Sequence, residues 1–191
     1  MISTITTESD YWMPAEWEPQ EAILFSWPHS NAHWNDFNLS QLDQKFAEIC
    51  ATISQNQMVH INLLEALTPR VGKALISQGA NLNHIQFFHL GNDDVWCRDH
   101  GPIFVKHRTT KNRLITNWEF NGWGDKFSPY ERDNDVPAKY AHARNLDILS
   151  PKMILEGGAI EVDGKGLLLT TEAVLKNPNR YASYSTKFHE N

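Results

Sequence analysis

The sequence predicts a single domain of mixed α and β structure (α+β). Short apolar runs that are typical of buried strands alternate with segments whose apolar residues recur at helical spacing. The chain has 191 residues, 41% hydrophobic and 11% aromatic, which suffices for one domain with a core and is short for two. Strands and helices are mixed throughout, without a long repeat, a low-complexity tract or an obvious linker.

The N-terminal part predicts one strand and one helix. Residues 21–27, EAILFSW, form a short apolar run between Pro19 and Pro28, which is typical of a buried strand. Ser40 stands three residues before Asp43, as in a capping box, and predicts the start of an amphipathic helix. The apolar residues that recur on one face of this helix are Leu42, Phe46, Ile49 and Ile53.

Two more strands with a helix between them are predicted next. The strand candidates are residues 58–64, MVHINLL, and residues 84–90, HIQFFHL. Between them, Thr68 and Pro69 supply a cap and a first-turn proline, and Gly79 marks the end of the helix. The second of these strands leads directly into an acidic loop.

The C-terminal half predicts short strands around a long loop. Residues 102–107 and 113–120 are expected to be neighbouring strands joined by a polar turn around Lys111 and Asn112. Residues 121–135 are expected to form a long loop, because Gly, Pro, Asn and Asp occur there without periodicity. The remaining expected elements are a short helix at 136–145, a short strand at 152–156, a hairpin over 159–171 that turns at Asp163-Gly164, and a frayed tail at 181–191, where neither a strand nor a helix pattern occurs.

Composition excludes several classes of partner. The net charge of −6 and pI near 5.8, with Lys and Arg scattered, argue against nucleic acid. The sequence has no apolar run near the roughly 20 residues of a membrane helix, and its N-terminus lacks the features of a signal peptide, so we expect a cytoplasmic protein without membrane contact. Cys50 and Cys97 have neither disulfide-framework nor zinc-site spacing and are expected to be free thiols.

Two acidic residues are candidates for binding a guanidinium, whose planar fork of N–H donors is gripped best by paired carboxylates. Asp99 precedes a rigid Gly-Pro turn, and Glu156 ends an expected strand before Gly157 and Gly158, where the absence of side chains lets backbone or a ligand come close. Each has a simpler alternative: Asp99 could pair with Arg98 or cap the turn, and Glu156 could be solvated.

The acidic loop before Asp99 admits two interpretations. Asp93 and Asp94 could bind a divalent metal together with Asp99 and His100, but hard-cation sites usually add several more oxygen ligands in a recognisable loop. We therefore expect no metal. Asp94 is instead expected to meet a cationic substrate tail, and Asp93 to be solvated.

Aromatic faces attract flat cations, so tryptophans near the acids could wall a pocket. The candidates are Trp96, Trp118 and Trp123, although most of the seven tryptophans are expected to belong to the core. We predict that Trp96, Trp123 and Gly157 contact substrate.

No nucleophile is evident beside the two acids. His100 and His107 have no thiol or hydroxyl placed for them to activate. Cys50 falls on the apolar face of a helix and is expected to be inert. Arg98 could lower the pKa of Cys97, but strand alternation would point this thiol away from the neighbouring carboxylate.

Four segments resemble a known family: MPAEWEPQEAILFSWP, NDDVWCRDHGPIF, WEFNGWG and LEGGAIEVDGKGLLLTTEAVLKNPNR. In this order, over about residues 13–180, they are similar to the first half of the agmatine deiminase and bacterial peptidylarginine deiminase-type family of the pentein superfamily. The resemblance implies a partial pentein fold, roughly half of a five-module ββαβ propeller, with residues 1–191 as a single incomplete domain. It also implies hydrolysis of a guanidine without a cofactor.

Family motifs assign roles to three positions. The Asp of the W-x-R-D motif and the Glu of the E-G-G motif face the substrate guanidinium, which implies catalytic roles for Asp99 and Glu156. Agmatine deiminases carry a further acid two residues before the motif tryptophan, which corresponds to Asp94. The acidic loop favours agmatine over arginine, since free arginine would call for a cation to pair with its α-carboxylate. Peptidyl-arginine is the other substrate that the family implies.

The family's general acid/base histidine and nucleophilic cysteine lie in later segments that have no counterpart here. We therefore expect a truncated deiminase that is inactive alone, whose apolar surface would promote self-association. Two alternatives stay open: a half-enzyme that a second chain completes, or a non-catalytic guanidine-binding module.

Overall fold

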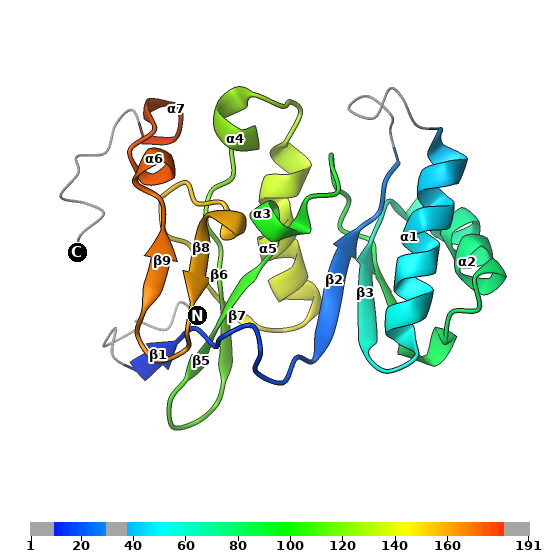
Figure 1. Cartoon of the computed structure of the whole chain (residues 1–191), viewed down its shortest axis with the longest axis horizontal. Helices are drawn as coiled ribbons and strands as arrows, with labels where there is room; N and C mark the ends of the chain where they lie inside the picture. The colour runs from blue at the N-terminus through cyan, green and yellow to red at the C-terminus, as the bar shows by residue number, and fades with distance from the viewer. Residues whose placement is uncertain (1–9, 30–37, 182–191) are drawn as a thin grey trace.

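The computed structural model describes residues 10–29 and 38–181. Three sheets lie side by side across this part of the chain (Figure 1). The strand orders are β2-β3-β4, β1-β5-β6-β7 and β8-β9. The strands are β1 (Tyr11–Trp12), β2 (Ala22–Ser26), β3 (Met58–Asn62), β4 (Ile85–Phe88), β5 (Ile103–His107), β6 (Arg113–Thr116), β7 (Asp147–Leu149), β8 (Ile160–Val162) and β9 (Leu168–Thr170). Helices lie between and around these sheets, so the predicted mixed α+β class is confirmed.

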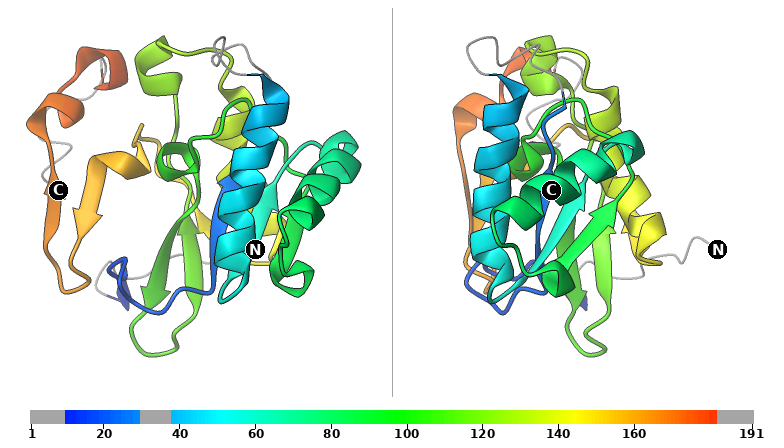
Figure 2. Two further views of the ribbon diagram at one scale, coloured as in Figure 1. Left: turned by 45° about the vertical axis from the view of Figure 1, so that its right-hand side comes forward. Right: turned by 90° about the vertical axis from the view of Figure 1, so that its right-hand side faces the viewer.

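The first sheet is parallel and is covered by helices α1 (Leu39–Ser54) and α2 (Thr68–Ser77) on one face (Figure 2). Val59 and Ile61 of β3 are fully buried in the core beneath these helices. His60, which alternation places on the opposite face, contacts Tyr140 instead. Because β3 is buried on both faces, residues 58–64 are mostly apolar, and their two polar members, His60 and Asn62, are buried as well.

Both predicted helices of this unit are present, but their N-caps differ from the prediction. The cap of α1 is Asn38 rather than Ser40: its side chain accepts from the Gln41 amide at 2.9 Å, and the Gln41 side chain reaches back to the Asn38 amide. Helix α2 begins at Thr68 with the following proline in its first turn, as predicted, but Thr68 makes no cap hydrogen bond. The short 3-10 turns η2 (Glu65–Leu67) and η3 (Leu82–His84) flank α2.

The second sheet contains the predicted pair β5 and β6, which are antiparallel and joined by a turn with Lys111 at φ 62°. Helix α5 (Glu131–Ala143) packs between this sheet and the first one, because Tyr140 contacts both Phe88 and Phe104. The expectation of a long loop over 121–135 is wrong, since a helical turn, α4 (Gly122–Asp125), and the start of α5 lie within it.

The start of α5 was hidden from sequence patterns for a physical reason. Asp93, 39 residues earlier in the chain, accepts a hydrogen bond from the Arg132 amide at 2.8 Å and so caps the first turn. Pro137 lies inside the helix, where a proline usually indicates a helix start or a break. The start of α5 is capped by a residue distant in the sequence, and its interior contains a proline. Residues 131–135 therefore lack the local signals by which a helix start is predicted.

The predicted hairpin is confirmed as β8 and β9, with Gly164 at φ 71° in its turn. The expected strand at 152–156 is wrong, because only one bridge forms there, between Ile154 and Glu119. Two short helices, α6 (Glu172–Leu175) and α7 (Pro178–Tyr181), follow the hairpin where no helix was expected. The predicted frayed tail, apart from its first residue, lies outside the described residues.

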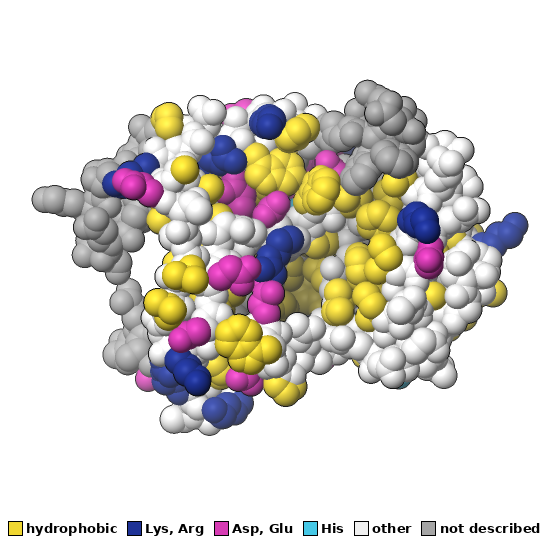
Figure 3. Space-filling view, in the orientation of Figure 1, with side chains coloured by type: hydrophobic (Ala, Val, Ile, Leu, Met, Phe, Trp, Pro, Cys, Tyr) yellow, Lys and Arg dark blue, Asp and Glu magenta, His cyan; other side chains and the backbone are white. Residues whose placement is uncertain are grey.

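An open cavity of about 790 Å³ separates β2 from β5 and β8. Figure 3 shows the hollow, with hydrophobic side chains along its walls. Its apolar lining includes Leu24, Phe104 and Ile160, while Glu21 and Arg113 lie at its rim as a charged pair. Within the described part of the chain, no helix has the length and apolar character to cross a bilayer.

Candidate functional site

Asp99 lies in a single helical turn, α3 (Cys97–His100), between the acidic loop and β5. The turn closes with a hydrogen bond from the Gly101 amide to the Cys97 carbonyl at 2.8 Å. Both carboxylate oxygens of Asp99 are engaged: Oδ1 accepts from the Gly158 amide at 3.1 Å and Oδ2 from Nε1 of Trp123 at 3.2 Å. Asp99 neither pairs with Arg98 nor merely caps its own turn, because its partners come from two distant segments.

The Glu-Gly-Gly segment packs directly on this turn. Glu156 is 4% exposed and precedes the 3-10 turn η4 (Gly157–Ala159). A Cβ on Gly157 would lie 2.4 Å from the carbonyl oxygen of Arg98, and one on Gly158 would lie 2.2 Å from Oδ1 of Asp99. The two glycines are therefore needed for close approach, and the approach brings the segments that carry Asp99 and Glu156 into contact.

Glu156 is not solvated, because it is paired with a guanidinium of the chain itself. Oε1 of Glu156 accepts from Nε of Arg180 at 2.8 Å, and the two side chains are 5% and 14% exposed. The Coulombic attraction between the two charges is stronger in a buried setting than at the surface, which offsets the cost of removing them from water. The geometry shows that this carboxylate can bind a planar guanidinium.

Trp123 is the predicted aromatic residue that the structure brings to Asp99. It lies in α4 with a left-handed backbone, φ 59°, which aims the indole N–H at the carboxylate. Its ring packs edge-on against Phe120 and Phe127 at centroid distances of 5.1 and 5.6 Å. Trp96, the other predicted aromatic residue, stands before α3 with 47% of its surface exposed.

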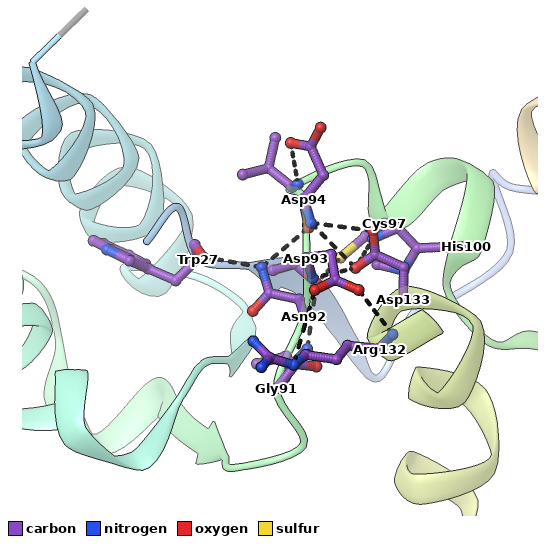
Figure 4. A network of polar contacts seen from close by, with 12 residues as sticks. Trp27, Gly91, Asn92, Asp93, Asp94, Cys97, His100, Arg132 and Asp133 are labelled. Carbon is purple, nitrogen blue, oxygen red and sulfur yellow. Dashed lines mark hydrogen bonds and ion pairs between the residues drawn. The ribbon is translucent and has the colours of Figure 1, made fainter. Parts of the chain in front are cut away.

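The acidic loop is organised by a residue that the sequence did not single out (Figure 4). Oδ1 of Asp133, from α5, accepts from the Asp93 amide at 2.8 Å, and its Oδ2 accepts from the Asp94 amide at 3.1 Å. Burial raises the pKa of Asp133 to about 7, against the opposing effect of these two amides. Asn92 adds hydrogen bonds from Nδ2 to the carbonyls of Trp27 and Asp94.

Asp93 and Asp94 have different environments. The Asp93 side chain is 7% exposed and caps α5, so the expectation that it is solvated is wrong. The Asp94 carboxylate points away from Asp133, and its Oδ1 accepts from the Val95 amide at 2.8 Å (Figure 4). Asp94 is 8% exposed and is therefore one of the buried charged residues of the loop.

Neither cysteine is an activated nucleophile. Cys97 lies on a helical turn rather than a strand, and its Sγ donates to Oγ of Ser26 at 3.0 Å. Burial raises the pKa of Cys97 to about 12, so the expectation that Arg98 could lower it is wrong. Burial also raises the pKa of Cys50, in the core under α1, to about 12, and the predicted burial of this thiol is confirmed.

His100 lies beneath the site and is 2% exposed. Burial lowers its pKa to about 4, which keeps the imidazole neutral, and its Nε2 is 3.7 Å from Oδ1 of Asp133.

Across residues 10–29 and 38–181, no group of three or more His, Cys, Asp or Glu side chains is arranged to hold a metal ion. Neither Asp99 nor Glu156 lines the open cavity, but the cavity borders the site, because Arg98 and Gly157 line it.

This fold is similar to solved pentein structures. The agmatine deiminase of Enterococcus faecalis, solved while catalysing its reaction, superposes with a TM-score of 0.83 at 28% identity, covering 95% of this chain and 49% of that one. A Campylobacter jejuni agmatine deiminase with substrate bound gives a TM-score of 0.80 at 27% identity, with coverages of 94% and 51%. The chain is thus about half of a pentein fold of the agmatine deiminase type.

Sequence relatives agree with the structural ones. A Yersinia pseudotuberculosis protein provisionally named agmatine deiminase is 31% identical over 177 residues, which are 91% of this chain and 46% of the relative. A similarly named Mycoplasma capricolum protein is 31% identical over 185 residues, 94% of this chain and 48% of the relative. The chain therefore spans about half the length of these relatives. The family described as Porphyromonas-type peptidyl-arginine deiminase matches residues 12–191, and the chain belongs to it.

Proposed function

We propose that this chain forms the guanidinium-binding half of an agmatine deiminase-like hydrolase. One observation carries the proposal: Glu156, on a loop that packs against Asp99, binds a guanidinium in the structure, that of Arg180. Asp99 and Glu156 would orient the substrate guanidinium and stabilise its charge during the reaction. Trp123 and Gly158 fix the position of Asp99 for this task.

Agmatine is the favoured substrate. Its tail ends in an amine, and the carboxylate of Asp94, buried in the acidic loop, has the opposite charge. Free arginine would need a cation for its α-carboxylate, whereas Arg180 is already engaged by Glu156. Peptidyl-arginine is the second candidate, because the family to which the chain belongs is described by that activity.

The overall reaction would hydrolyse agmatine to N-carbamoylputrescine and ammonia, a step of putrescine biosynthesis in the cytoplasm. Family chemistry uses a thiolate to attack the guanidinium carbon. Both cysteines of this sequence are un-ionised near neutral pH, and Cys97 is hydrogen-bonded to Ser26. We therefore infer that the chain alone binds guanidines without hydrolysing them.

Completion by a second chain is the alternative for which the surface offers support. Leu167, Leu168 and Leu169 on and beside the edge strand β9 are 56%, 52% and 62% exposed. An apolar edge strand of this kind favours pairing with another chain, either a copy of this one or a partner that brings the cysteine and histidine. A non-catalytic guanidine-binding module would need no such partner.

Calorimetric titration with agmatine tests the proposal, with putrescine as the matched ligand that keeps an amine tail but lacks the guanidinium. Agmatine is expected to bind and putrescine to bind at least tenfold more weakly, while no ammonia is released. Arginine and a peptidyl-arginine in parallel rank the substrate classes. Equal affinity for agmatine and putrescine would contradict guanidinium recognition, and ammonia release by the purified chain would contradict inactivity.

A further inference from the structure

Arg180 contacts a carboxylate of the candidate site, but the proposed function assigns no task to Arg180 itself. Its Nε donates to Oε1 of Glu156 at 2.8 Å, through the side of the guanidinium rather than its terminal fork. The second oxygen of Glu156 accepts no hydrogen bond from residues 10–29 or 38–181. One oxygen is therefore held by the chain, and the other is left for a ligand.

The segment that carries Arg180 is itself fixed to the site. Nδ2 of Asn121 donates to the carbonyl of Asn179 at 3.1 Å. A Cβ on Gly124 would lie 2.6 Å from Cβ of Asn179 and 3.1 Å from Nη1 of Arg180, so α7 packs closely on α4. The same turn, α4, carries Trp123, which donates to Asp99. One structural unit thus supports both carboxylates.

We propose that Arg180 is a positioning residue that fixes the side chain of Glu156 for guanidinium binding. This inference rests on the proposed function, because it concerns the same carboxylate. A carboxylate that is 5% exposed loses its hydration, and a buried cationic donor offsets that loss while also selecting one rotamer. Removal of Arg180 would leave Glu156 buried without this partner and free to turn away from the ligand.

The competing interpretation is that Arg180 occupies the site as an internal substitute for substrate. A guanidinium that mimicked substrate would present its two-pronged fork to the carboxylate, as bidentate pairs do. Contact through Nε alone favours the positioning role. The two interpretations predict opposite effects of Arg180 variants on agmatine affinity, so one experiment separates them.

The variants Arg180→Gln and Arg180→Lys test the inference, with Lys176→Gln as the matched control that removes one charge from the same segment. We expect Arg180→Gln to weaken agmatine binding about tenfold or more, as loss of a charged hydrogen bond does. Arg180→Lys keeps the charge without the planar guanidinium and should fall between wild type and Arg180→Gln. Lys176→Gln should stay within twofold. Tighter or unchanged binding in Arg180→Gln would overturn the positioning role, and if that variant does not fold, Arg180→Lys decides in the same way.

Two further readouts make the role specific. If Arg180 acts through Glu156, the double variant Glu156→Gln/Arg180→Gln binds agmatine no more weakly than Glu156→Gln alone, whereas additive losses would contradict the inference. Without ligand, the two Hγ resonances of Glu156 should be distinct in wild type and merge in Arg180→Gln, and unchanged resonances would overturn the role. If the wild-type chain does not bind agmatine, the proposed function is contradicted. The ligand-free measurement still tests whether Arg180 fixes the side chain of Glu156.

Discussion

The amide of Gly158 donates to Oδ1 of Asp99 at 3.1 Å, across 59 residues of chain. This hydrogen bond joins the loop after Glu156 to the turn that carries Asp99, and it fixes one carboxylate of the candidate site relative to the other. Its geometry depends on the absence of a side chain at Gly158. A side chain at Gly158 should therefore displace the Asp99 carboxylate and weaken ligand binding.

Alanine at the two glycines should separate these effects. Gly158→Ala places its Cβ 2.2 Å from a side-chain oxygen that can rotate, so it should mainly displace Asp99 and weaken agmatine binding. Gly157→Ala meets the Arg98 carbonyl at 2.4 Å, which only a backbone shift can relieve, and should lower the free energy of unfolding by about 1–3 kcal/mol. Urea denaturation and agmatine titration measure the two effects.

Gly72→Ala is the matched control for these variants. Gly72 lies in α2, and a Cβ added there would have no neighbouring atom within 4 Å. Its substitution should raise the free energy of unfolding by about 0.5–1 kcal/mol, because alanine is the better helix former. Equal destabilisation by all three alanines would contradict the close packing described for the Glu-Gly-Gly segment.

Trp123→Phe should weaken agmatine binding while the fold persists. Phenylalanine keeps an aromatic ring against Phe120 and Phe127 but removes the N–H that holds Oδ2 of Asp99. The expected loss is about tenfold in affinity, as for a hydrogen bond to a charged acceptor. Trp17→Phe, at a site 75% exposed, is the control and should bind as wild type does. Equal agmatine affinity of Trp123→Phe and Trp17→Phe would contradict a role for the Trp123 N–H in agmatine binding.

Both thiols should resist labelling in the native protein. With the pKa of Cys50 and Cys97 raised to about 12 by burial, the thiolate population at pH 8 should be at least about 100-fold below that of an ordinary cysteine. Reaction with a disulfide reagent should therefore be slow in buffer and fast in urea, where the burial is lost. Rapid labelling of Cys97 in buffer would contradict the description of its environment and the inference of inactivity.

Stability should decrease as the pH falls below neutrality, and His60 contributes to that decrease. Burial, with a smaller effect of Arg144, lowers the pKa of His60 to about 4, and its Nδ1 is 2.5 Å from Oη of Tyr140. Between pH 6.5 and 4 the unfolded chain therefore binds a proton that the folded chain does not. This costs about 2 kcal/mol between pH 7 and pH 5. His100 acts in the same direction, while Asp133, whose pKa is raised, opposes both.

His60→Gln isolates this contribution. Urea denaturation at pH 7 and pH 5 should show a smaller difference in unfolding free energy for His60→Gln than for wild type. His89→Gln, on the exposed surface, is the control and should retain the wild-type difference. The same pH sensitivity in all three proteins would show that His60 does not take up a proton on unfolding.

Sequence patterns predicted the elements whose causes are local. Apolar runs located β2, β3 and β4, and the glycine-containing turn at Asp163 located the hairpin of β8 and β9. The Glu-Gly-Gly motif indicated close backbone approach, which the contact of Gly157 with Arg98 confirms. In each case the signal lies within a few residues of the structure that it specifies.

The features that were missed depend on long-range contacts. Asp133 organises the acidic loop from α5, and nothing near it in the sequence indicates that its partners lie 39 and 40 residues away. Arg180 was part of a segment without a helix pattern, although the segment's resemblance to the family was a usable signal. Asp93 was expected in solvent because its partner, the first turn of α5, was itself not predicted.

An NMR titration tests the central claim most directly, by following the Trp123 indole N–H and the Gly158 amide as agmatine is added. Both groups donate to Asp99, so a guanidinium bound there should shift both resonances while the Gly72 amide stays fixed. Putrescine at the same concentrations should shift neither. Unmoved Trp123 and Gly158 resonances, or equal shifts with putrescine, would contradict guanidinium binding at Asp99 and Glu156.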